Sequence, residues 1–196
     1  MKKIFLFFCF LLFNGITYSQ ELRATWIARD QLNFKDAIAL AIDSIKSGNF
    51  NTIYVNVWSR GYPLWPSEVF YSHTGIYIDP AYEGRDILAE VIAEAHRAKL
   101  HVEAWFEYGF VGGYEQYYPG NSGKGKIFDV HPEWIAKKVD GSEKDNSNFY
   151  WMVQTRKDVQ DFLIALVMEI VRKYDIDGIE LDRIRYSNLQ YGYDVY

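Results

Sequence analysis

The strongest constraint on the fold is the alternation of short β-branched segments with amphipathic helical segments. Strands are predicted at residues 23–27, 52–58, 101–108 and 179–181. Between them, helices are predicted after Asn33 as far as Gly48, at 85–98 and from Thr155 to Tyr174. Asn33 is the expected cap of the first helix, and Thr155 with Asp158 has capping-box spacing. Because parallel strands need crossovers of about ten or more residues, this order predicts an α/β protein with a parallel sheet and right-handed connections.

Periodicity alone does not separate an open doubly wound sheet from a (β/α)8 TIM-type barrel. Two features favour the barrel: the first strand lacks a glycine-rich fingerprint, and unusual residues gather in the long segments 59–84 and 109–148. We expect little regular structure in segment 109–148. About four βα units are present, which predicts a partial barrel with an uncovered strand edge and uncovered apolar faces.

Residues 171–186 place acids at the end of the last predicted strand. Ile179 and Leu181 share one face of that strand, and Glu180 and Asp182 share the other. An ionised carboxylate is too costly to leave in an apolar layer, so this face should meet water or a ligand. Asp182, at the carboxyl end, is therefore the strongest candidate for a chemical role.

A second set of acids follows the third predicted strand. Glu103, Trp105 and Glu107 alternate and share a face, with Glu107 at the carboxyl end. Two acids at one rim match glycosidic bond cleavage, in which one carboxyl protonates the leaving oxygen and another attacks or activates water. Asp182, Glu107 and Glu180 are thus the predicted catalytic residues, although Glu180 shares the strand of Asp182 and the partner acid should come from another strand. The alternative is that Glu103 and Glu180 pair inside a polar layer with Arg23, Arg183 or Arg185.

Aromatic and basic side chains near strand ends are the candidates for sugar binding. Arg60 and Arg185 could orient substrate hydroxyls or carboxylates, or hold Asp182 ionised. Core packing is the alternative for Trp105. The predicted substrate-binding residues are Trp58, Arg60, Tyr62, Trp65, Trp105, Tyr108 and Arg185.

Charge and motifs argue against other functions. The chain has 26 acidic and 21 basic residues, a net charge of −5, which disfavours binding to nucleic acid. Residues 120–126 match G-x-x-x-x-G-K, but Ile127 replaces the required Ser or Thr and we expect no helix start there, so a phosphate loop is rejected. His73, His96, His101 and His131 have no metal-ligand spacing, so neither a metal nor a cofactor is predicted.

The first twenty residues predict export. Lys2 and Lys3 precede an apolar run at 4–12 and a small polar stretch at 14–20, which is typical of a cleaved signal peptide over residues 1–20. A membrane anchor is the alternative, although the run is short for a bilayer. The prediction is a secreted or periplasmic protein without a stable anchor, in which residues 21–196 form one domain and the sole cysteine, Cys9, is removed.

Several stretches, in order, resemble the glycosyl hydrolase-like 10 family of bacterial envelopes. They are Arg-Ala-Thr-Trp at 23–26, Asn-Thr-Ile-Tyr-Val-Asn-Val-Trp-Ser-Arg-Gly at 51–61, Trp-Pro-Ser at 65–67, Ala-Trp-Phe-Glu-Tyr-Gly-Phe at 104–110, His-Pro-Glu-Trp at 131–134, and Tyr-Asp-Ile-Asp-Gly-Ile-Glu-Leu-Asp-Arg-Ile-Arg-Tyr at 174–186.

The resemblance implies a (β/α)8 barrel that hydrolyses O-glycosidic bonds of an envelope or extracellular polysaccharide, with peptidoglycan glycan strands as the best-supported substrate among relatives. In the family pattern Glu107 ends strand three and Asp182 ends strand four. Ser187 stands where relatives usually have proline, and the family domain continues beyond this point, so we expect the N-terminal part of the barrel. The alternatives are a catalytically silent glycan-binding protein and an inactive fragment.

Overall fold

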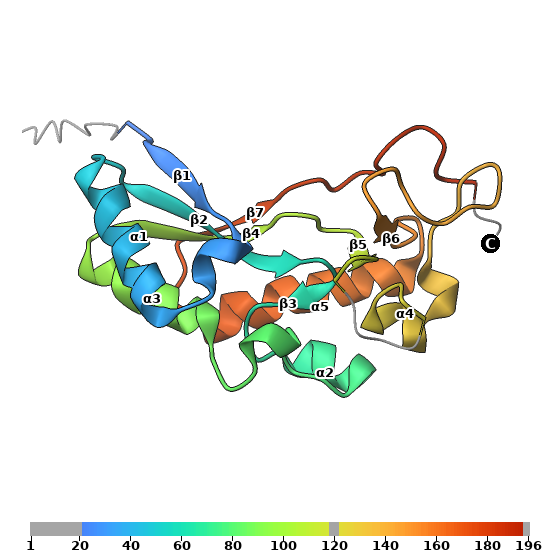
Figure 1. Ribbon diagram of the computed structural model, residues 1–196, viewed down its shortest axis with the longest axis horizontal. Helices are drawn as coiled ribbons and strands as arrows, with labels where there is room; N and C mark the ends of the chain where they lie inside the picture. The colour runs from blue at the N-terminus through green and yellow to red at the C-terminus, as the bar shows by residue number, and fades with distance from the viewer. Residues whose placement is uncertain (1–20, 118–121, 194–196) are drawn as a thin grey trace, which may run out of the picture.

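The structure is a computed structural model, and it describes residues 21–117 and 122–193 (Figure 1). The signal peptide predicted at 1–20 lies outside these residues. The strands are β1 (Ala24–Ile27), β2 (Thr52–Ser59), β3 (Tyr62–Pro63), β4 (His101–Phe106), β5 (Val111–Tyr114), β6 (Phe149–Trp151) and β7 (Gly178–Leu181). The helices are α1 (Lys35–Ser47), α2 (Glu68–Thr74), α3 (Ile87–Arg97), α4 (Lys126–Val130) and α5 (Lys157–Lys173), with 3-10 turns η1 (Arg29–Leu32), η2 (Pro80–Tyr82) and η3 (Pro132–Trp134).

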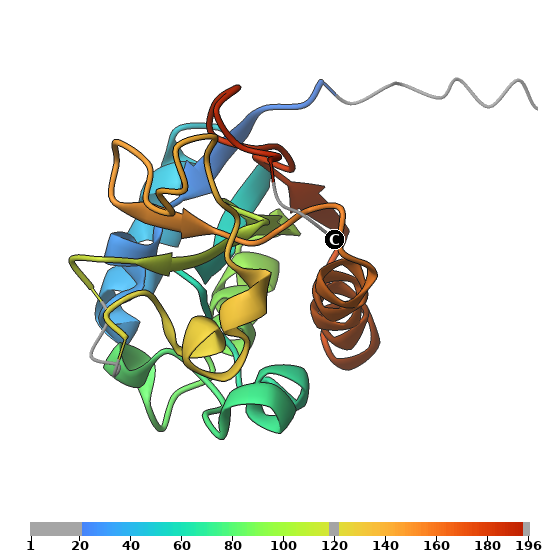
Figure 2. The ribbon, with the colours of Figure 1, turned by 90° about the vertical axis from the view of Figure 1, so that its right-hand side faces the viewer.

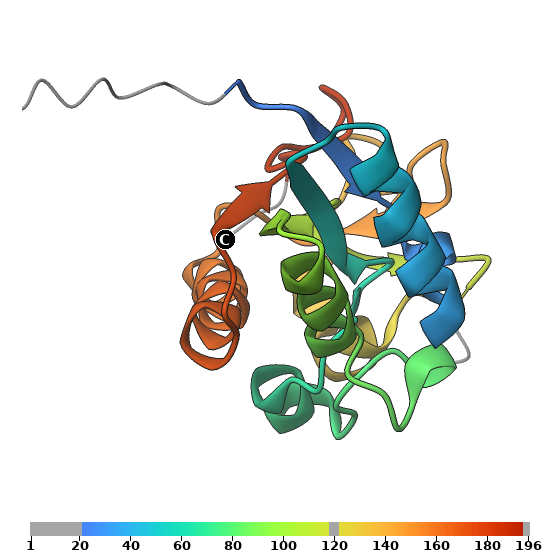
Figure 3. The same ribbon diagram turned by 90° about the vertical axis from the view of Figure 1, so that its left-hand side faces the viewer.

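Four parallel strands form the main sheet in the order β1-β2-β4-β7. The helices α1, α3 and α5 connect successive strands of this sheet and lie on the same side of it (Figure 3). The strand order never reverses, as it would at the switch point of a doubly wound sheet. The predicted α/β architecture with a parallel sheet is confirmed, and its order is the one that a barrel requires.

The core fills the space between the sheet and these helices. Ile53, Val55 and Val57 have no exposed surface, and α3 contacts both β2 and β4. Burying an aliphatic side chain of this size stabilises the fold by roughly 1.5–3 kcal/mol. Because side chains alternate along a strand, Tyr54 and Asn56 face the opposite side of the sheet, which would be the interior of a barrel.

Two helix starts differ from the prediction. Asn33 does not cap α1, because its side chain donates to the Asp30 carbonyl within the preceding 3-10 turn. Thr155 and Asp158 do not form a capping box, because α5 begins after Arg156 and the Asp158 carboxylate accepts hydrogen bonds from the Arg156 guanidinium. In both places a nearby polar partner competes with the helix terminus for the same side chain.

The segments after β2 and β4 carry more regular structure than predicted. Segment 109–148 contains β5, α4 and η3, and β5 pairs with β6 in a small antiparallel sheet beyond the carboxyl ends of the main strands (Figure 2). α4 starts directly after Gly125, where no helix start is predicted. The segment before α4 packs closely against β5, and this contact requires glycine at position 113, since a Cβ there would lie 1.6 Å from the Lys124 carbonyl oxygen.

β7 forms an open edge. Within the described residues it pairs only with β4, and Leu181 is 49% exposed. Ile164, Met168 and Val171 leave an apolar stripe exposed on α5. The uncovered edge and faces expected of a partial barrel are therefore present in this part of the chain. No helix among the described residues is long and apolar enough to cross a membrane.

Candidate active site

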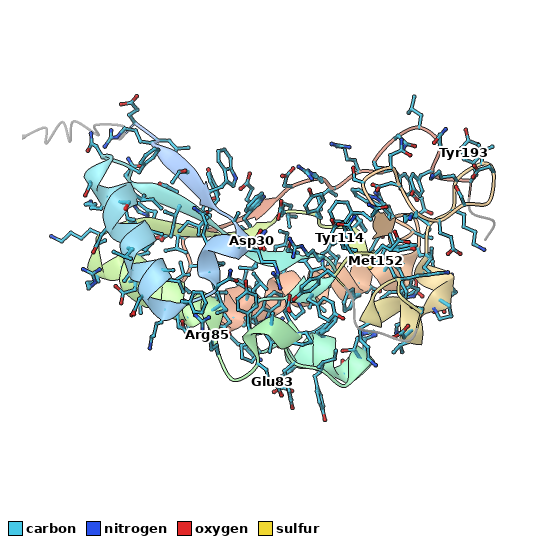
Figure 4. All side chains as sticks on the ribbon, viewed as in Figure 1. Asp30, Glu83, Arg85, Tyr114, Met152 and Tyr193 are labelled. Carbon is cyan, nitrogen blue, oxygen red and sulfur yellow. The ribbon has the colours of Figure 1, made fainter. Side chains whose placement is uncertain are left out.

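The carboxyl ends of the parallel strands meet at one rim, where charged side chains gather. Asp30 follows β1 closely, Arg60 follows β2, Glu107 follows β4 and Asp182 follows β7. The Arg60 guanidinium lies 3.8 Å from Asp30 and 5.5 Å from the ring centroid of Tyr114, so it links two residues labelled in Figure 4. Ligands of parallel α/β proteins bind at the carboxyl edge, so this rim is the candidate site.

Glu107 is a partly buried acid at the end of β4. Its Oε2 accepts hydrogen bonds from Asn56 Nδ2 at 2.7 Å and from Ser59 Oγ at 3.4 Å. Burial raises the pKa of the Glu107 carboxyl above its ordinary value, and the Arg183 charge and these hydrogen bonds offset only part of that effect. Glu107 therefore keeps its proton to a higher pH than an exposed glutamate.

Asp182 lies at the neighbouring strand end. Its main-chain N–H donates to the Phe106 carbonyl at 3.1 Å, and the Gly109 N–H donates to the Asp182 carbonyl at 3.2 Å. Asp182 Oδ1 accepts a hydrogen bond of 2.6 Å from the N–H of Arg183, a residue with a left-handed φ of 50°. The two acids thus end adjacent strands at one rim, as predicted, while their catalytic role stays a prediction.

Glu180 lies one layer below the rim among indole rings. It pairs in register with Trp105, and Trp26 Nε1 donates to Glu180 Oε2 at 2.9 Å. Burial raises the pKa of Glu180, the Trp26 hydrogen bond lowers it, and the charges of Asp182 and Glu103 raise it again. An indole N–H therefore takes the place that the alternative interpretation gave to an arginine.

Three of the predicted sugar-binding aromatics lie in the core. Trp58, Tyr62 and Trp65 have no exposed surface, so their rings cannot stack on a sugar and the prediction is wrong for all three. For Trp58 the reason is a register shift between Asn56 and Trp58, which moves Trp58 to the helix-facing side of the sheet. Trp58 there lies edge-on to Phe162 of α5, with ring centroids 6.0 Å apart.

The remaining predicted rings and Arg185 do reach the inner face or the rim. Trp105 is 8% exposed, which leaves only an edge for contact. The Tyr108 ring packs between the Arg183 guanidinium, 4.0 Å from its centroid, and the Phe149 ring at 4.6 Å. Arg185 lines a rim cavity of about 190 Å³ together with these three residues. Tyr108 is therefore more a support for its neighbours than a free sugar platform.

Four residues of the rim were not predicted. Asn56 could have been found, because the alternation that selects Glu107 also places Asn56 on the inner face of β2. Its side chain is fully buried, and its Oδ1 has no partner among the described residues. Asp30, Tyr114 and Arg183 lie in turns or in the small sheet, where strand periodicity carries no signal.

The histidines form no recognisable metal centre. In the described part of the chain no group of three or more His, Cys, Asp or Glu residues could hold a metal ion. His73 Nδ1 and His131 Nε2 do lie 2.9 Å apart, although they are distant in sequence. Burial lowers the pKa of His73 and the nearby His131 adds to this effect, so His73 keeps its neutral form to a lower pH than an exposed histidine.

Comparison with known proteins matches the glycosyl hydrolase-like 10 family model to residues 21–196. Glycosyl hydrolase DigH of Escherichia coli (strain K12) is 27% identical over 159 residues, which cover 74% of this chain and 33% of DigH. Glycosyl hydrolase YngK of Bacillus subtilis (strain 168) is 24% identical over 189 residues, which cover 83% of this chain and 33% of YngK. The chain thus spans about a third of the length of these curated relatives.

Solved structures share the fold. A hypothetical protein from Ruminiclostridium thermocellum ATCC 27405 superposes with a TM-score of 0.64 at 20% identity, over 86% of this chain and 80% of that chain. The galactosidase domain of alpha-galactosidase-sucrose kinase AgaSK superposes with a TM-score of 0.56 at 16% identity, over 88% of this chain and 23% of that chain. The alpha-galactosidase TtGalA of Thermus thermophilus superposes with a TM-score of 0.53 at 13% identity, over 84% of this chain and 31% of that chain. The likeness confirms the fold prediction, a partial TIM-type barrel.

Proposed function

The chain belongs to the glycosyl hydrolase-like 10 family, and from that premise we propose that it hydrolyses O-glycosidic bonds of an envelope or extracellular polysaccharide. The observation that carries the proposal is the pair of carboxyl groups at adjacent strand ends. Both are partly buried, but Glu107 is hydrogen-bonded by the side chains of Asn56 and Ser59, whereas Asp182 is hydrogen-bonded by a main-chain N–H. Two carboxyl groups in unlike surroundings suit unlike roles.

The surroundings suggest which group takes which role. Glycosidic cleavage needs a carboxyl group that still holds a proton to give to the leaving oxygen, and a charged carboxylate on the other side of the reaction centre. Burial raises the pKa of Glu107, which suits the proton donor. Asp182 then acts as the nucleophile or as the carboxylate that stabilises the positively charged sugar.

Other rim groups would bind the substrate. Arg60, which spans Asp30 and the Tyr114 ring, and Arg185 at the rim cavity can donate to sugar hydroxyls or carboxylates. Glu180 is bonded to Trp26 below the rim, so its proposed part is to orient the indoles that form the floor of the site. Among polysaccharides we propose peptidoglycan glycan strands, supported by the family and by the predicted signal peptide.

The direct test is the release of reducing ends from purified glycan strands by the full-length gene product. Glu107→Gln and Asp182→Asn should each lower the rate by about a hundredfold or more, since positioned acid–base groups contribute roughly 10²–10⁴-fold. The matched control is Glu103→Gln, which makes the same chemical change on the same strand below the rim. Equal rates for wild type and Asp182→Asn would remove Asp182 from the chemistry.

A glycan-binding protein without catalytic activity is the competing function. It would retain glycan strands on the rim and release no reducing ends. Wild-type binding without release, unchanged by Glu107→Gln, would favour this function over hydrolysis.

Export is a further part of the proposal. It rests on the basic and apolar pattern of residues 1–20. N-terminal sequencing of the protein recovered from the periplasm or medium should find a start near residue 20. Recovery of the uncleaved chain from the membrane fraction would support the anchor instead.

A further inference from the structure

A large groove lies on the outside of the barrel, on the segment between β3 and α3. We call it the α2 groove. Its volume is about 740 Å³, several times that of the rim cavity. Figure 4 places one of its residues, Glu83, at the lower edge of the molecule, and Arg85 lies below Asp30 in the same view. Nothing in the proposed catalytic chemistry uses this surface. Its lining includes Tyr71, Tyr77, Ile78, Pro80, Glu83 and Arg85.

A stacked pair of exposed tyrosines lines the groove. The rings of Tyr71 and Tyr77 stack with centroids 4.1 Å apart and planes 8° apart. They are 43% and 41% exposed. Stacking buries one face of each ring and fixes the orientation of both. An exposed ring with a fixed orientation suits contact with the apolar C–H face of a sugar.

The charges of the groove favour an uncharged ligand over an acidic one. The Arg85 guanidinium is already occupied by Glu90, at 2.6 Å, and by the Leu32 and Asn33 carbonyls. Glu83 has no ion pair with any described residue, so its carboxylate is available to accept hydrogen bonds from hydroxyl groups. An unpaired carboxylate beside aromatic rings repels acidic ligands.

Hydrogen bonds within the chain hold the walls of the groove in place. The Ser67 N–H donates to the Tyr77 carbonyl at 2.8 Å, and the Gly75 N–H donates to the Tyr71 carbonyl at 2.8 Å. Asp86 caps α3 through the Ala89 N–H and also accepts a hydrogen bond from the Tyr174 hydroxyl. A preformed surface loses less conformational entropy when it binds.

We propose that the α2 groove is a second glycan-binding site that holds uncharged sugar units of a polysaccharide outside the catalytic rim. The identity of the ligand as a glycan rests on the proposed function. One of the two tyrosines stacks its free face on a sugar ring, the other fixes its orientation, and Glu83 accepts hydrogen bonds from the sugar hydroxyls. A polymer held at both places stays near the rim between cleavages, because linked binding raises its effective concentration there.

The test separates binding from hydrolysis. Retention on insoluble chitin, an uncharged polymer of N-acetylglucosamine, is measured in a Glu107→Gln, Asp182→Asn background so that turnover does not remove the ligand. Adding Tyr71→Ala and Tyr77→Ala should weaken binding about tenfold, whereas Phe at both positions should keep it within about threefold. Tyr193→Ala is the matched control, because Tyr193 is also exposed, at 58%, and lies far from the groove (Figure 4).

Three results would overturn the proposal. They are no retention of the background protein on chitin, equal retention of the alanine and control variants, and tighter binding to acidic polygalacturonate than to chitin. Hydrolysis is followed separately on a short soluble oligosaccharide, where the groove variant in the otherwise wild-type protein should keep its rate. An inactive wild type that still binds chitin through the two tyrosines would end the hydrolase proposal and leave the groove assignment standing.

Discussion

Glu169 on α5 ties the segment after β3 to the barrel helices. The residue is only 7% exposed. Oε2 accepts from Trp65 Nε1 at 3.0 Å and from Ser67 Oγ at 2.5 Å, and Oε1 accepts from the Glu68 N–H and from Lys173 Nζ, both at 2.8 Å. Three of the four donors belong to the segment that enters α2. We therefore predict that Glu169→Ala weakens the attachment of this segment to α5 and lowers the stability of the protein.

The expected loss follows from the groups left behind. Trp65 and Ser67 have no exposed surface, so their N–H and O–H groups would remain buried without an acceptor, at about 1–3 kcal/mol each. The Glu68 N–H loses its acceptor as well. The free energy of unfolding should fall by about 3–5 kcal/mol, which for a chain of this size lowers the melting temperature by about 10 °C.

Urea and thermal unfolding measure this loss. Asp161→Asn is the control, because its carboxylate is exposed on the same helix and should change stability by at most about 0.5 kcal/mol. A loss below about 1 kcal/mol for Glu169→Ala would refute the reasoning.

The same residue should govern acid stability. Burial alone would raise the pKa of Glu169. Hydrogen bonds from Lys173, Ser67, Trp65 and the Glu68 N–H outweigh this effect, so the net pKa lies below the ordinary value. A depressed pKa adds stability that is present above the unfolded-state pKa and lost as the pH falls through the folded-state pKa. Wild type should therefore lose stability on acidification more steeply than Glu169→Ala. Parallel curves for the two proteins would contradict the assignment.

Two further perturbations test the rim. Gly61→Ala should lower the free energy of unfolding by about 2 kcal/mol or more, because Gly61 has a φ of 84° and a Cβ there would lie 2.1 Å from the Gly112 carbonyl oxygen. Gly75→Ala is the control: Gly75 has a φ of 74° but open space around it, so the loss should be about 1 kcal/mol. Equal losses in urea unfolding would contradict the close approach of Gly61 to Gly112. Burial raises the pKa of Glu107 in the folded protein, so wild-type stability should fall as the pH rises from the ordinary pKa of glutamate through this raised pKa. Glu107→Gln should show no such fall. A fall of equal size in the variant would show that another group causes it.

Sequence periodicity predicts the framework of this fold because the framework obeys local rules. Leu88, Val91, Ile92 and Ala95 recur at helical spacing in the segment predicted as a helix, and all four lie buried on α3. The alternation in β4 and β7 places Glu107 and Asp182 at one rim because parallel strands end together. These features depend only on residues a few positions apart, so no knowledge of distant contacts is needed.

The remaining features depend on contacts between distant segments. Glu169 resembles an ordinary exposed helix residue in the sequence, yet its indole partner, Trp65, is 104 positions away. The pairing of β5 with β6 joins residues separated by α4 and η3, and it requires Gly113 where the chain packs against Lys124. No local sequence pattern indicates such a contact between distant segments. The sequence therefore does not predict the second sheet, which lies in a segment expected to be irregular.

The register shift in β2 shows how one local irregularity shapes the candidate site. Before the shift, Asn56 pairs with Trp105 on the inner face, and after it Trp58 pairs with Phe106 on the helix side. The extra residue reverses the alternation, so Ser59 faces inward again beside Asn56. Both side chains then reach the Glu107 carboxyl, which would otherwise be half-buried with fewer hydrogen-bond donors. The same shift removes Trp58 from the site and supplies Glu107 with its neighbours, so the unlike surroundings of the two rim acids originate in β2.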